Sequence, residues 1–366
     1  MKLLVIVPLI VLFSGVSFSQ FSKKSDTISK KEGIFLFPLL YYTPDTRFAV
    51  GAVGVYYFNT GDTISQSGKD TRLSYVKMLS DYTQNRQLDI WSSWNIFTNQ
   101  EKYLFKGEVR YRNFPDRYYG VGNSTTLAQK EYYSYDLFMF KLLALRQFRK
   151  KLFVGLDYHL SYEYNFKHEP GGELIGGSVT GYKGGLGSGV GAVLTYDTRD
   201  NVVNAHEGML FELSSYVFNN AFGGNFNYTA INLTFNKYWE LKENHVLAFN
   251  SVLKMNYGGV PFLDMARVGG DDLLRGYANN RFRDHHFAGF QFEYRFPVWW
   301  RFGMVVFTGV GDVFSTPKDI QFNTLKYSFG AGIRYAINRK ERLNARVDFG
   351  LGRKSDAFYI MLTEAF

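Results

Sequence analysis

Residues 154–166, VGLDYHLSYEYNF, decide the fold class because their side chains alternate strictly. Valine, leucine, tyrosine or phenylalanine occupies every even position, and glycine or a polar residue occupies every odd position. Successive side chains of a β-strand point to opposite faces, so the stretch predicts a strand with one apolar and one polar face. Such a strand is longer than the ~5–6 residues usual in globular proteins and suits a tilted membrane strand.

The same alternation recurs in residues 291–296, 327–335 and 342–349. In each stretch the apolar row is rich in tyrosine and phenylalanine, whereas the opposite row carries charges such as Arg295 and Arg346. A soluble β-sandwich also alternates, but it buries its apolar row and places most tyrosines at its edges. Aromatic rows facing lipid and charged rows facing a wet lumen favour a membrane-spanning barrel.

Segments of this kind continue from residue 34 to residue 366 and predict an all-β, antiparallel barrel of about sixteen strands. An even strand number is typical of bacterial outer-membrane barrels. The alternation is weakest in residues 132–145, where two apolar faces compete. The predicted strands are 34–41, 46–58, 71–82, 86–98, 102–114, 132–148, 151–166, 186–198, 206–218, 227–241, 244–257, 285–296, 301–314, 325–338, 341–350 and 356–366.

Composition excludes several classes of protein. The 366 residues include 35 Phe, 27 Tyr and 5 Trp, with 46% hydrophobic and 20% charged residues, which excludes a disordered chain. The absence of Cys excludes disulfides and thiolate metal sites. After the N-terminus there is no apolar run of the ~18 residues that a membrane helix needs. The net charge of +9 is spread along the chain, so we expect no nucleic-acid partner.

The N-terminus has the features of a secretory signal. Lys2 precedes the apolar run 3–13, and residues 17–19 have the small-x-small pattern accepted by signal peptidase. The alternative is a membrane anchor, but the run is too short to cross ~30 Å of hydrocarbon. We therefore expect a removed signal at 1–19, a short periplasmic leader at 20–33 and a barrel at 34–366, integral to the outer membrane of a Gram-negative bacterium.

Catalytic and metal-binding patterns are weak. The six His form no pair with metal-ligand spacing, so we expect neither a metal nor another cofactor. His159 and Ser161 share one face, as an outer-membrane lipase would require, but no Gly-x-Ser-x-Gly elbow is present, which favours lumen lining over an enzyme. The glycines of residues 185–191 recur at every second position and lead into a strand, which indicates clearance on the inner wall for something inside the barrel.

The longest predicted connections, 114–131, 167–185 and 258–284, are candidate extracellular loops, where function concentrates. The last of them contains RVGGDDLLRGY at residues 267–277. Gly269 and Gly270 form a Gly-Gly turn ahead of Arg275, Gly276 and Tyr277, and the loop lies between the eleventh and twelfth predicted strands. In this motif and its position the chain resembles the BamA/TamA superfamily of outer-membrane assembly and secretion barrels.

The resemblance implies that this loop folds back into the lumen, where Arg275 pairs with an acid of the inner wall. Such a charge-assisted pair is strong and often bidentate. The position of the family's usual acid is Gly309 here, so the candidate partners are Glu293, Asp312 and Asp348. The alternative is an exposed loop whose arginine is only solvated.

Three further segments are similar to the family. Asp197, Arg199 and Asp200, followed by Gly208, resemble its Asp-x-Arg-Asp turn between strands eight and nine, and residues 114–123 resemble its Phe-Pro…Gly-x-Gly-Asn segment. The chain's end resembles the C-terminal signal read by the barrel-assembly machinery, although Glu364 interrupts the apolar face. The residues of that signal are Phe358, Ile360, Leu362 and Phe366.

The resemblance implies a function in outer-membrane protein assembly, secretion or transport. We expect a stand-alone barrel without the family's POTRA domains, served by a periplasmic or outer-membrane protein partner. Its other expected partners are outer-membrane lipid and the barrel-assembly machinery that inserts it. The first and last strands would form a weak seam, because Pro38 removes a ladder donor. The alternative function is a passive or structural barrel plugged by the Arg275 loop.

Overall fold

The computed structural model describes residues 32–43, 46–58, 60, 74–99, 101–177, 179–339 and 342–366. The predicted signal and all but the last two residues of the predicted leader lie outside this part of the chain. No helix among the described residues is long and apolar enough to cross a membrane.

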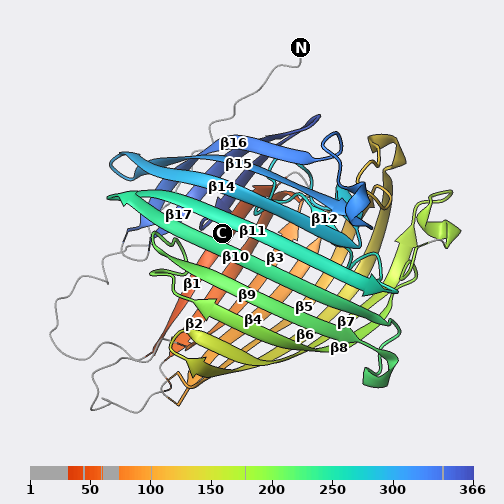
Figure 1. Cartoon of the computed structure of the whole chain (residues 1–366), viewed down its shortest axis with the longest axis horizontal. Coiled ribbons are helices and arrows are strands. Elements are labelled where there is room, and N and C mark those ends of the chain that lie inside the picture. The colour runs from red at the N-terminus through yellow and green to blue at the C-terminus, as the bar shows by residue number, and fades with distance from the viewer. Residues whose placement is uncertain are drawn as a thin grey trace. The chain divides into compact units, whose positions relative to one another are not determined.

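Sixteen strands of the described part form one closed antiparallel barrel (Figure 1), which confirms the predicted fold class. Each strand pairs with its neighbours in the chain, except that β11 pairs with β14 and β1 pairs with β18 to close the barrel. The barrel strands are β1 (Glu32–Thr43), β2 (Arg47–Phe58), β3 (Ser74–Thr83), β4 (Leu88–Thr98), β5 (Tyr103–Tyr118), β6 (Glu131–Arg149), β7 (Leu152–His168), β8 (Gly185–Asp197), β9 (Gly208–Phe218), β10 (Tyr228–Lys242), β11 (His245–Gly258), β14 (His286–Trp299), β15 (Phe302–Phe314), β16 (Lys326–Asn338), β17 (Leu343–Gly352) and β18 (Ser355–Leu362).

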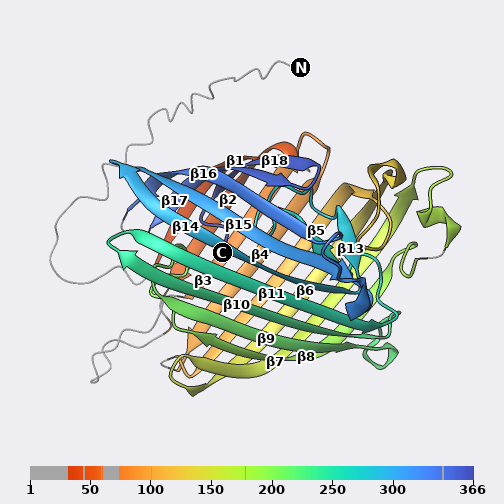
Figure 2. The same cartoon turned by 45° about the horizontal axis from the view of Figure 1, so that its top comes forward.

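Connections of different kinds gather at the two ends of the barrel (Figure 2). At one end, which we call the turn end, tight turns join β6 to β7, β10 to β11 and β14 to β15. At the other, the loop end, the connections are longer, and the one from β11 to β14 contains the short strands β12 (Ala266–Val268) and β13 (Phe282–Asp284). Four other loop-end connections contain single-turn 3₁₀ helices: η2 (Leu127–Gln129), η3 (Leu174–Gly176), η4 (Asn220–Phe222) and η5 (Pro317–Asp319).

The predicted alternation sorts side chains between the outer surface and the lumen. On β14, Phe292 lies on the exposed outer row, whereas Glu293 is fully buried in the lumen. On β17, Phe349 is exposed and Asp348 is fully buried. The polar row is therefore the inner wall, as predicted, but many of its charges are covered by protein and not by water.

The prediction for Phe166 is wrong, because a bulge interrupts β7. Ser134 pairs with Lys167 but Asp136 pairs with Tyr164, so two residues of β7 lie opposite the single residue Tyr135. Asn165 adopts a left-handed φ of 54° within this bulge, a conformation that asparagine tolerates better than most residues. The bulge turns Phe166 into the lumen, where its ring stacks on Tyr135 at a centroid distance of 5.4 Å.

The weak alternation of β6 also has a structural cause. Its inner row contains Tyr133, Tyr135, Met139 and Leu145, all buried, while its outer row exposes Phe138 to the surroundings of the barrel. Both faces of β6 are therefore apolar. Two residues of the inner row belong to an aromatic cluster at the loop end of the lumen beside β5 to β10, made of Tyr118, Tyr133, Tyr135, Leu174, Val179, Phe218, Phe226, Tyr228, Ala230, Val260, Phe262 and Met265.

As predicted, the glycines of β8 leave space at the inner wall. Aromatic rings of β9 occupy this space. A Cβ atom at Gly189 would lie 2.8 Å from the ring of Phe218, and one at Gly191 would overlap the ring of Tyr216. The loop tip with Arg275 contacts the opposite wall instead.

Candidate functional site

The candidate site is built around the loop that joins β11 to β14. Its stem is the two-stranded sheet of β12 and β13, in which Val268 pairs with Phe282. The tip between them turns sharply, with φ of 101° at Gly269, 117° at Gly270 and 113° at Gly276. Glycine adopts these angles without steric cost, so the Gly-Gly turn and the Arg-Gly step shape the tip.

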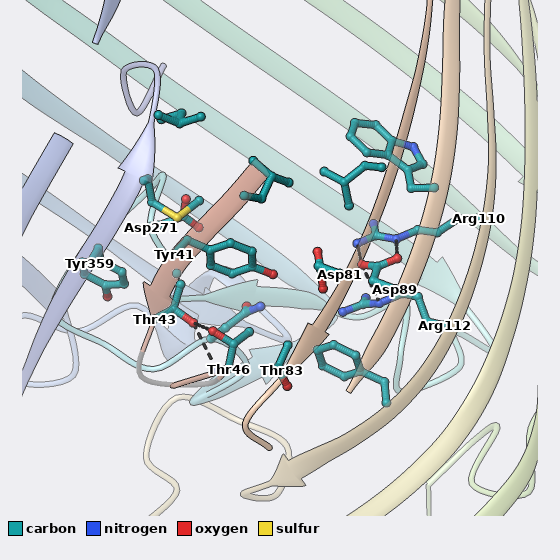
Figure 3. Close-up of a pocket in the computed structure, with 18 of the residues that line it drawn as sticks. Tyr41, Thr43, Thr46, Asp81, Thr83, Asp89, Arg110, Arg112, Asp271 and Tyr359 are labelled. Carbon is teal, nitrogen blue, oxygen red and sulfur yellow. Dashed lines mark hydrogen bonds and ion pairs between the residues drawn. The ribbon is translucent and has the colours of Figure 1, made fainter. Parts of the chain in front are cut away.

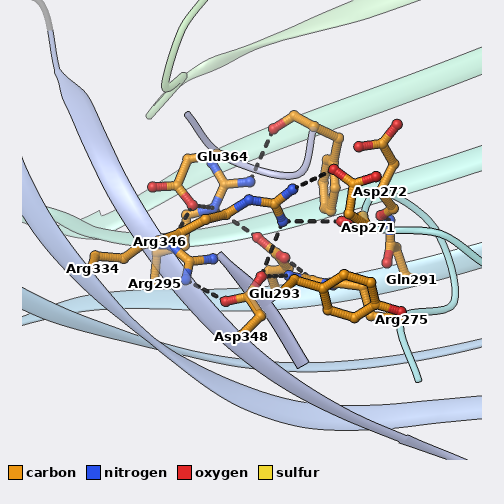
Figure 4. A network of polar contacts seen from close by, with 12 residues as sticks. Asp271, Asp272, Arg275, Gln291, Glu293, Arg295, Arg334, Arg346, Asp348 and Glu364 are labelled. Carbon is orange, nitrogen blue, oxygen red and sulfur yellow. Dashed lines mark hydrogen bonds and ion pairs between the residues drawn. The ribbon is translucent and has the colours of Figure 1, made fainter. Parts of the chain in front are cut away.

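Arg275 lies at the tip and is fully buried inside the lumen (Figure 4). Its Nη1 donates to Asp348 Oδ2 at 2.6 Å, its Nη2 donates to Glu293, and its guanidinium carbon lies 3.6 Å from the ring centroid of Phe307. Two of the three predicted partners therefore contact it together, and we call Arg275, Glu293 and Asp348 the loop lock. Asp312 is not a partner; it accepts from Lys326 at 3.1 Å.

Gly276 lets the tip approach the wall more closely than any other residue could. A Cβ atom there would lie 2.8–2.9 Å from the backbone of Gly350, Leu351 and Gly352. Its carbonyl accepts from Ser355 Oγ at 2.6 Å, and its N–H donates to Tyr359 Oη at 3.2 Å. The loop tip is therefore fixed to β17 and β18 through backbone atoms.

Tyr277 extends this contact. Its hydroxyl donates to the carbonyl of Tyr327 at 3.0 Å and accepts from the N–H of Arg353 at 2.7 Å. A Cβ atom at Gly352 would lie 2.5 Å from its ring, so this glycine of β17 is needed for the tyrosine to fit.

Gly309, where the resemblance led us to expect the family's acid, lies against Leu274. Atoms of the Leu274 side chain would lie 3.1 Å from a Cβ placed at Gly309 or at Gly311, and Leu274 is fully buried. The inner wall of β15 thus receives an apolar side chain. The negative charges that pair with Arg275 come from the neighbouring strand β14 and from β17.

A larger ionic network surrounds the loop lock. Asp348 also accepts from Arg334 and from Arg346, and Glu293 accepts from Arg295 Nε at 3.0 Å. Arg346 holds the loop as well, by donating to the carbonyl and the carboxylate of Asp271, each at 3.0 Å. We did not predict these roles of Arg295, Arg334 and Arg346. Their positions in the charged rows of alternating strands could have indicated that they face the lumen.

Burial makes these charges interdependent. Removing one partner of a buried ion pair leaves an uncompensated charge, which typically costs about 3–5 kcal/mol. Burial lowers the pKa of Arg275, but the carboxylates of Glu293 and Asp348 outweigh this effect and hold the pKa above its ordinary value. Desolvation by the surrounding protein, followed by the neighbouring Asp271 carboxylate, raises the pKa of Asp272 in the same loop to about 6, although its side chain is exposed.

The predicted C-terminal signal is only partly on the outer surface. Phe358 and Leu362 are exposed there, but β18 ends at Leu362 and Thr363 has a left-handed φ of 65°. Phe366 consequently lies inside the lumen, with its ring 6.3 Å from that of Tyr238. Its expected place beside Leu362 on the outer face is wrong, because Glu364 turns inward to accept from Arg334 Nε at 2.7 Å.

The predicted turn motif lies at the turn end. Arg199 and Asp197 form an ion pair at 3.0 Å, and Asp200 accepts from the N–H of His206 at 3.0 Å and pairs with Arg342. Gly208 has φ of 94° and lies against the carbonyl of Thr198. The motif therefore ties the β8–β9 connection to the β16–β17 turn.

The predicted 114–123 segment is split between a strand and a loop. β5 continues through Pro115 to Tyr118, beyond the end that we predicted at residue 114. The N–H of Gly122 then donates to the carbonyl of Arg283 at 2.8 Å, and Asn123 accepts from Lys326 at 2.7 Å. This loop therefore covers the stem of the Arg275 loop.

A cavity of about 510 Å³ remains between the loop tip and the strands that close the barrel (Figure 3). Its wall includes Tyr41 of β1, Asp89 of β4, Arg112 of β5, Asp271 of the loop and Tyr359 of β18. Here β1 and β18 meet in the seam, where the register contains the single pair Tyr42 and Ile360. By contrast, β1 pairs with β2 along its whole length, from Glu32 to Thr43.

The lipase-like pair does not form a catalytic arrangement. The ring of His159 packs edge-on against Phe218 at 5.5 Å, and its Nε2 has no hydrogen-bond partner among the described residues. Within the same part of the chain, no three His, Asp or Glu residues are grouped as metal ligands.

Comparisons with known proteins agree with this architecture. Residues 57–351 match the model of the Omp85 superfamily domain. The crystal structure of BamA from Haemophilus ducreyi lacking POTRA domains 1–3 is similar with a TM-score of 0.59 at 12% identity, over 91% of this chain and 70% of that chain. CdiB from Acinetobacter baumannii gives 0.58 at 9% identity, over 92% and 60%. CdiB from Escherichia coli gives 0.56 at 8% identity, over 91% and 63%. A search of curated proteins found no match.

Proposed function

Because this chain belongs to the Omp85 superfamily, we propose that it is an outer-membrane barrel that handles polypeptide or lipid at the β1–β18 seam, in assembly, secretion or transport. The observation that carries this proposal is the seam itself, where one residue pair joins two strands that are otherwise fully paired on their other sides. Unpaired strand edges are templates for pairing with another chain. A partner protein would deliver the substrate.

The contents of the lumen favour a function at the seam and not in a central pore. The loop lock holds the tip against β17 and β18, and the aromatic cluster lies beside β5 to β10. The loop tip and the aromatic cluster thus occupy part of the lumen, while a cavity borders both strands of the seam.

A disulfide across the seam tests the proposal. The chain has no Cys, so Tyr42→Cys with Ile360→Cys would introduce one specific crosslink between paired positions. We expect oxidised cells to lose the same outer-membrane or surface proteins as a deletion strain, and reduction to restore them. The matched control is Phe349→Cys with Phe358→Cys, a pair between β17 and β18 that leaves the seam free. Normal protein levels with the seam crosslinked, but not in the deletion strain, would contradict the proposal.

The second candidate function is a plugged pore or structural barrel, and the buried loop lock is the observation that favours it. Planar-bilayer conductance separates the two. Steady conductance by the purified protein, raised by Arg275→Ala, would favour the pore. A closed wild-type barrel whose deletion impairs surface-protein assembly would favour the seam.

A further inference from the structure

Four basic side chains gather at two neighbouring turns of the turn end. The β4–β5 turn contains Lys102, β6 ends at Arg149, and the turn that follows contains Lys150 and Lys151. All four side chains are exposed. The two turns lie side by side, because the N–H of Gln147 donates to the carbonyl of Lys102 at 2.8 Å. The four cations therefore form one group on the surface.

A fifth basic residue, Arg146, lies on the outer face of β6. It pairs with Tyr103 of β5 and with Val154 of β7, and its side chain is exposed. Further toward the middle of the barrel wall, Leu156 of the same outer face is 71% exposed, and Phe148, nearer the turn, is also 71% exposed. Arg146 therefore lies within an apolar surface, with apolar side chains on both sides of it along the strands.

We call Lys102, Arg146, Arg149, Lys150 and Lys151 the basic rim. None of its five cations has an ion-pair partner within the part of the chain that the structure describes. The neighbouring acids are Glu101 in the β4–β5 turn and Asp197 at the end of β8, which pairs with Arg199 at 3.0 Å. Among the described residues, the basic rim thus keeps a surplus of positive charge.

The position of Arg146 favours a lipid over a soluble partner. An acidic protein that approached the turn end from water would meet Lys150 and Lys151. Arg146 instead lies on the apolar outer face, which a membrane barrel presents to lipid. A long basic side chain in such a place buries its stem and extends its charge to the headgroup region. Basic residues beside a membrane surface attract anionic lipids.

We propose that the basic rim and the adjoining outer face of β5, β6 and β7 bind an anionic phospholipid. Arg146, Lys150 and Lys151 hold the headgroup phosphate by charge-assisted hydrogen bonds. The acyl chains lie along the exposed apolar side chains of Val154 and Leu156. None of these strands belongs to the seam, so the site is independent of any function at β1 and β18.

Native mass spectrometry of the purified barrel, with phosphatidylglycerol or phosphatidylcholine added to the detergent, tests the site. We expect phosphatidylglycerol to bind at least about tenfold more tightly, since each basic residue at a membrane surface favours an anionic lipid roughly fivefold. Arg146→Gln with Lys150→Gln and Lys151→Gln should lose at least about tenfold in affinity for phosphatidylglycerol and little for phosphatidylcholine. Equal affinity of the wild type for the two lipids, as a surface for an acidic protein would show, or an unaffected triple variant would overturn the proposal.

The matched control is Lys183→Gln with Lys318→Gln and Lys354→Gln, which makes the same change in net charge at three exposed lysines of the loop end. It should keep the preference for phosphatidylglycerol, and so should Arg146→Lys, which keeps the charge of the site. Glycerol phosphate carries a phosphate without acyl chains and should not displace the lipid at equal concentration. Displacement by glycerol phosphate, or an equal loss in the control, would contradict a lipid site.

Fluorescence in vesicles tests where the lipid lies. The chain has no Cys, so Ala144→Cys, one outward position from Arg146 on β6, can carry a single bimane label. The vesicles contain equal amounts of the two lipids, and a nitroxide quencher is attached to the acyl chain of one or the other. We expect stronger quenching when phosphatidylglycerol carries the nitroxide. A label at Val306→Cys, on the exposed outer face of β15, should be quenched equally by both. Equal quenching at Ala144→Cys would overturn the proposal.

Discussion

At the scale of single residues, the buried guanidinium of Arg275 is the most sensitive point of the molecule. Its removal leaves Glu293 and Asp348 without their shared partner in a dry environment. We expect Arg275→Ala to lower the free energy of unfolding by about 3–5 kcal/mol and to release the loop tip. Limited proteolysis within 266–284 measures the release. The control is Arg281→Ala, which removes a half-buried arginine of the same loop. Arg281 bonds to Thr125 of the β5–β6 connection, and its removal should have a smaller effect.

The close approach of the Arg275 loop to β17 leads to a second prediction. A Cβ atom at Gly350 would lie 2.6 Å from the carbonyl carbon of Arg275, where only backbone could give way. Gly350→Ala should therefore destabilise the barrel by about 1–3 kcal/mol, as overpacking does, and should also loosen the loop. Thermal unfolding of the purified barrel measures the change. Gly176→Ala, where a Cβ atom meets open space, should leave the melting temperature nearly unchanged.

Titration of Asp272 should make the stability of the folded protein depend on pH. Its pKa of about 6 in the folded protein is above the ~3.9 of an unperturbed aspartate, so the folded state binds its proton more tightly. The free energy of unfolding should therefore fall as pH rises through the interval between these values. Asp272→Asn should flatten this part of the pH profile, measured by loop proteolysis or denaturant unfolding. An unchanged profile would show that Asp272 does not titrate there.

At the scale of elements, the bulge in β7 determines the face of the barrel on which Phe166 lies, and Phe138 of the neighbouring strand β6 serves as its comparison. Phe166 packs in the aromatic cluster, whereas Phe138 lies on the exposed outer row. Phe166→Ala should cost up to about 3 kcal/mol, because it removes a partly buried ring that packs against the buried rings of the cluster. Phe138→Ala should cost less, since lipid or detergent can fill the space. Equal losses in denaturant unfolding would contradict the assignment of Phe166 to the lumen.

Strand alternation made most of these elements predictable from the sequence. The rows containing Phe292 and Phe349 differ so clearly in polarity from those of Glu293 and Asp348 that the strands and their faces follow from period two alone. The bulge at Asn165 was not predictable in this way, because one left-handed residue leaves the composition of the strand unchanged while it reverses the face of Phe166. For β6, the apolar inner row was visible, but its partners come from distant loops.

At the scale of the whole molecule, the sequence indicated the loop motif and the acids that could meet Arg275. It could not choose among them, because Glu293, Asp312 and Asp348 are alike in sequence and differ only in their position on the wall. The fixed end of the chain was also missed: Glu364 was noted as an interruption of an apolar face, but its partners Arg334 and Asn344 lie on other strands.

The loop lock also imposes an order on the formation of the barrel. Arg275 binds Asp348, 73 residues later in the chain, and Gly276 binds Tyr359, 83 residues later. Contacts between residues so far apart form slowly, because a long intervening chain must first be ordered. The loop tip has no wall to dock against until β17 and β18 are in place. Docking of the loop tip therefore marks the completion of the barrel.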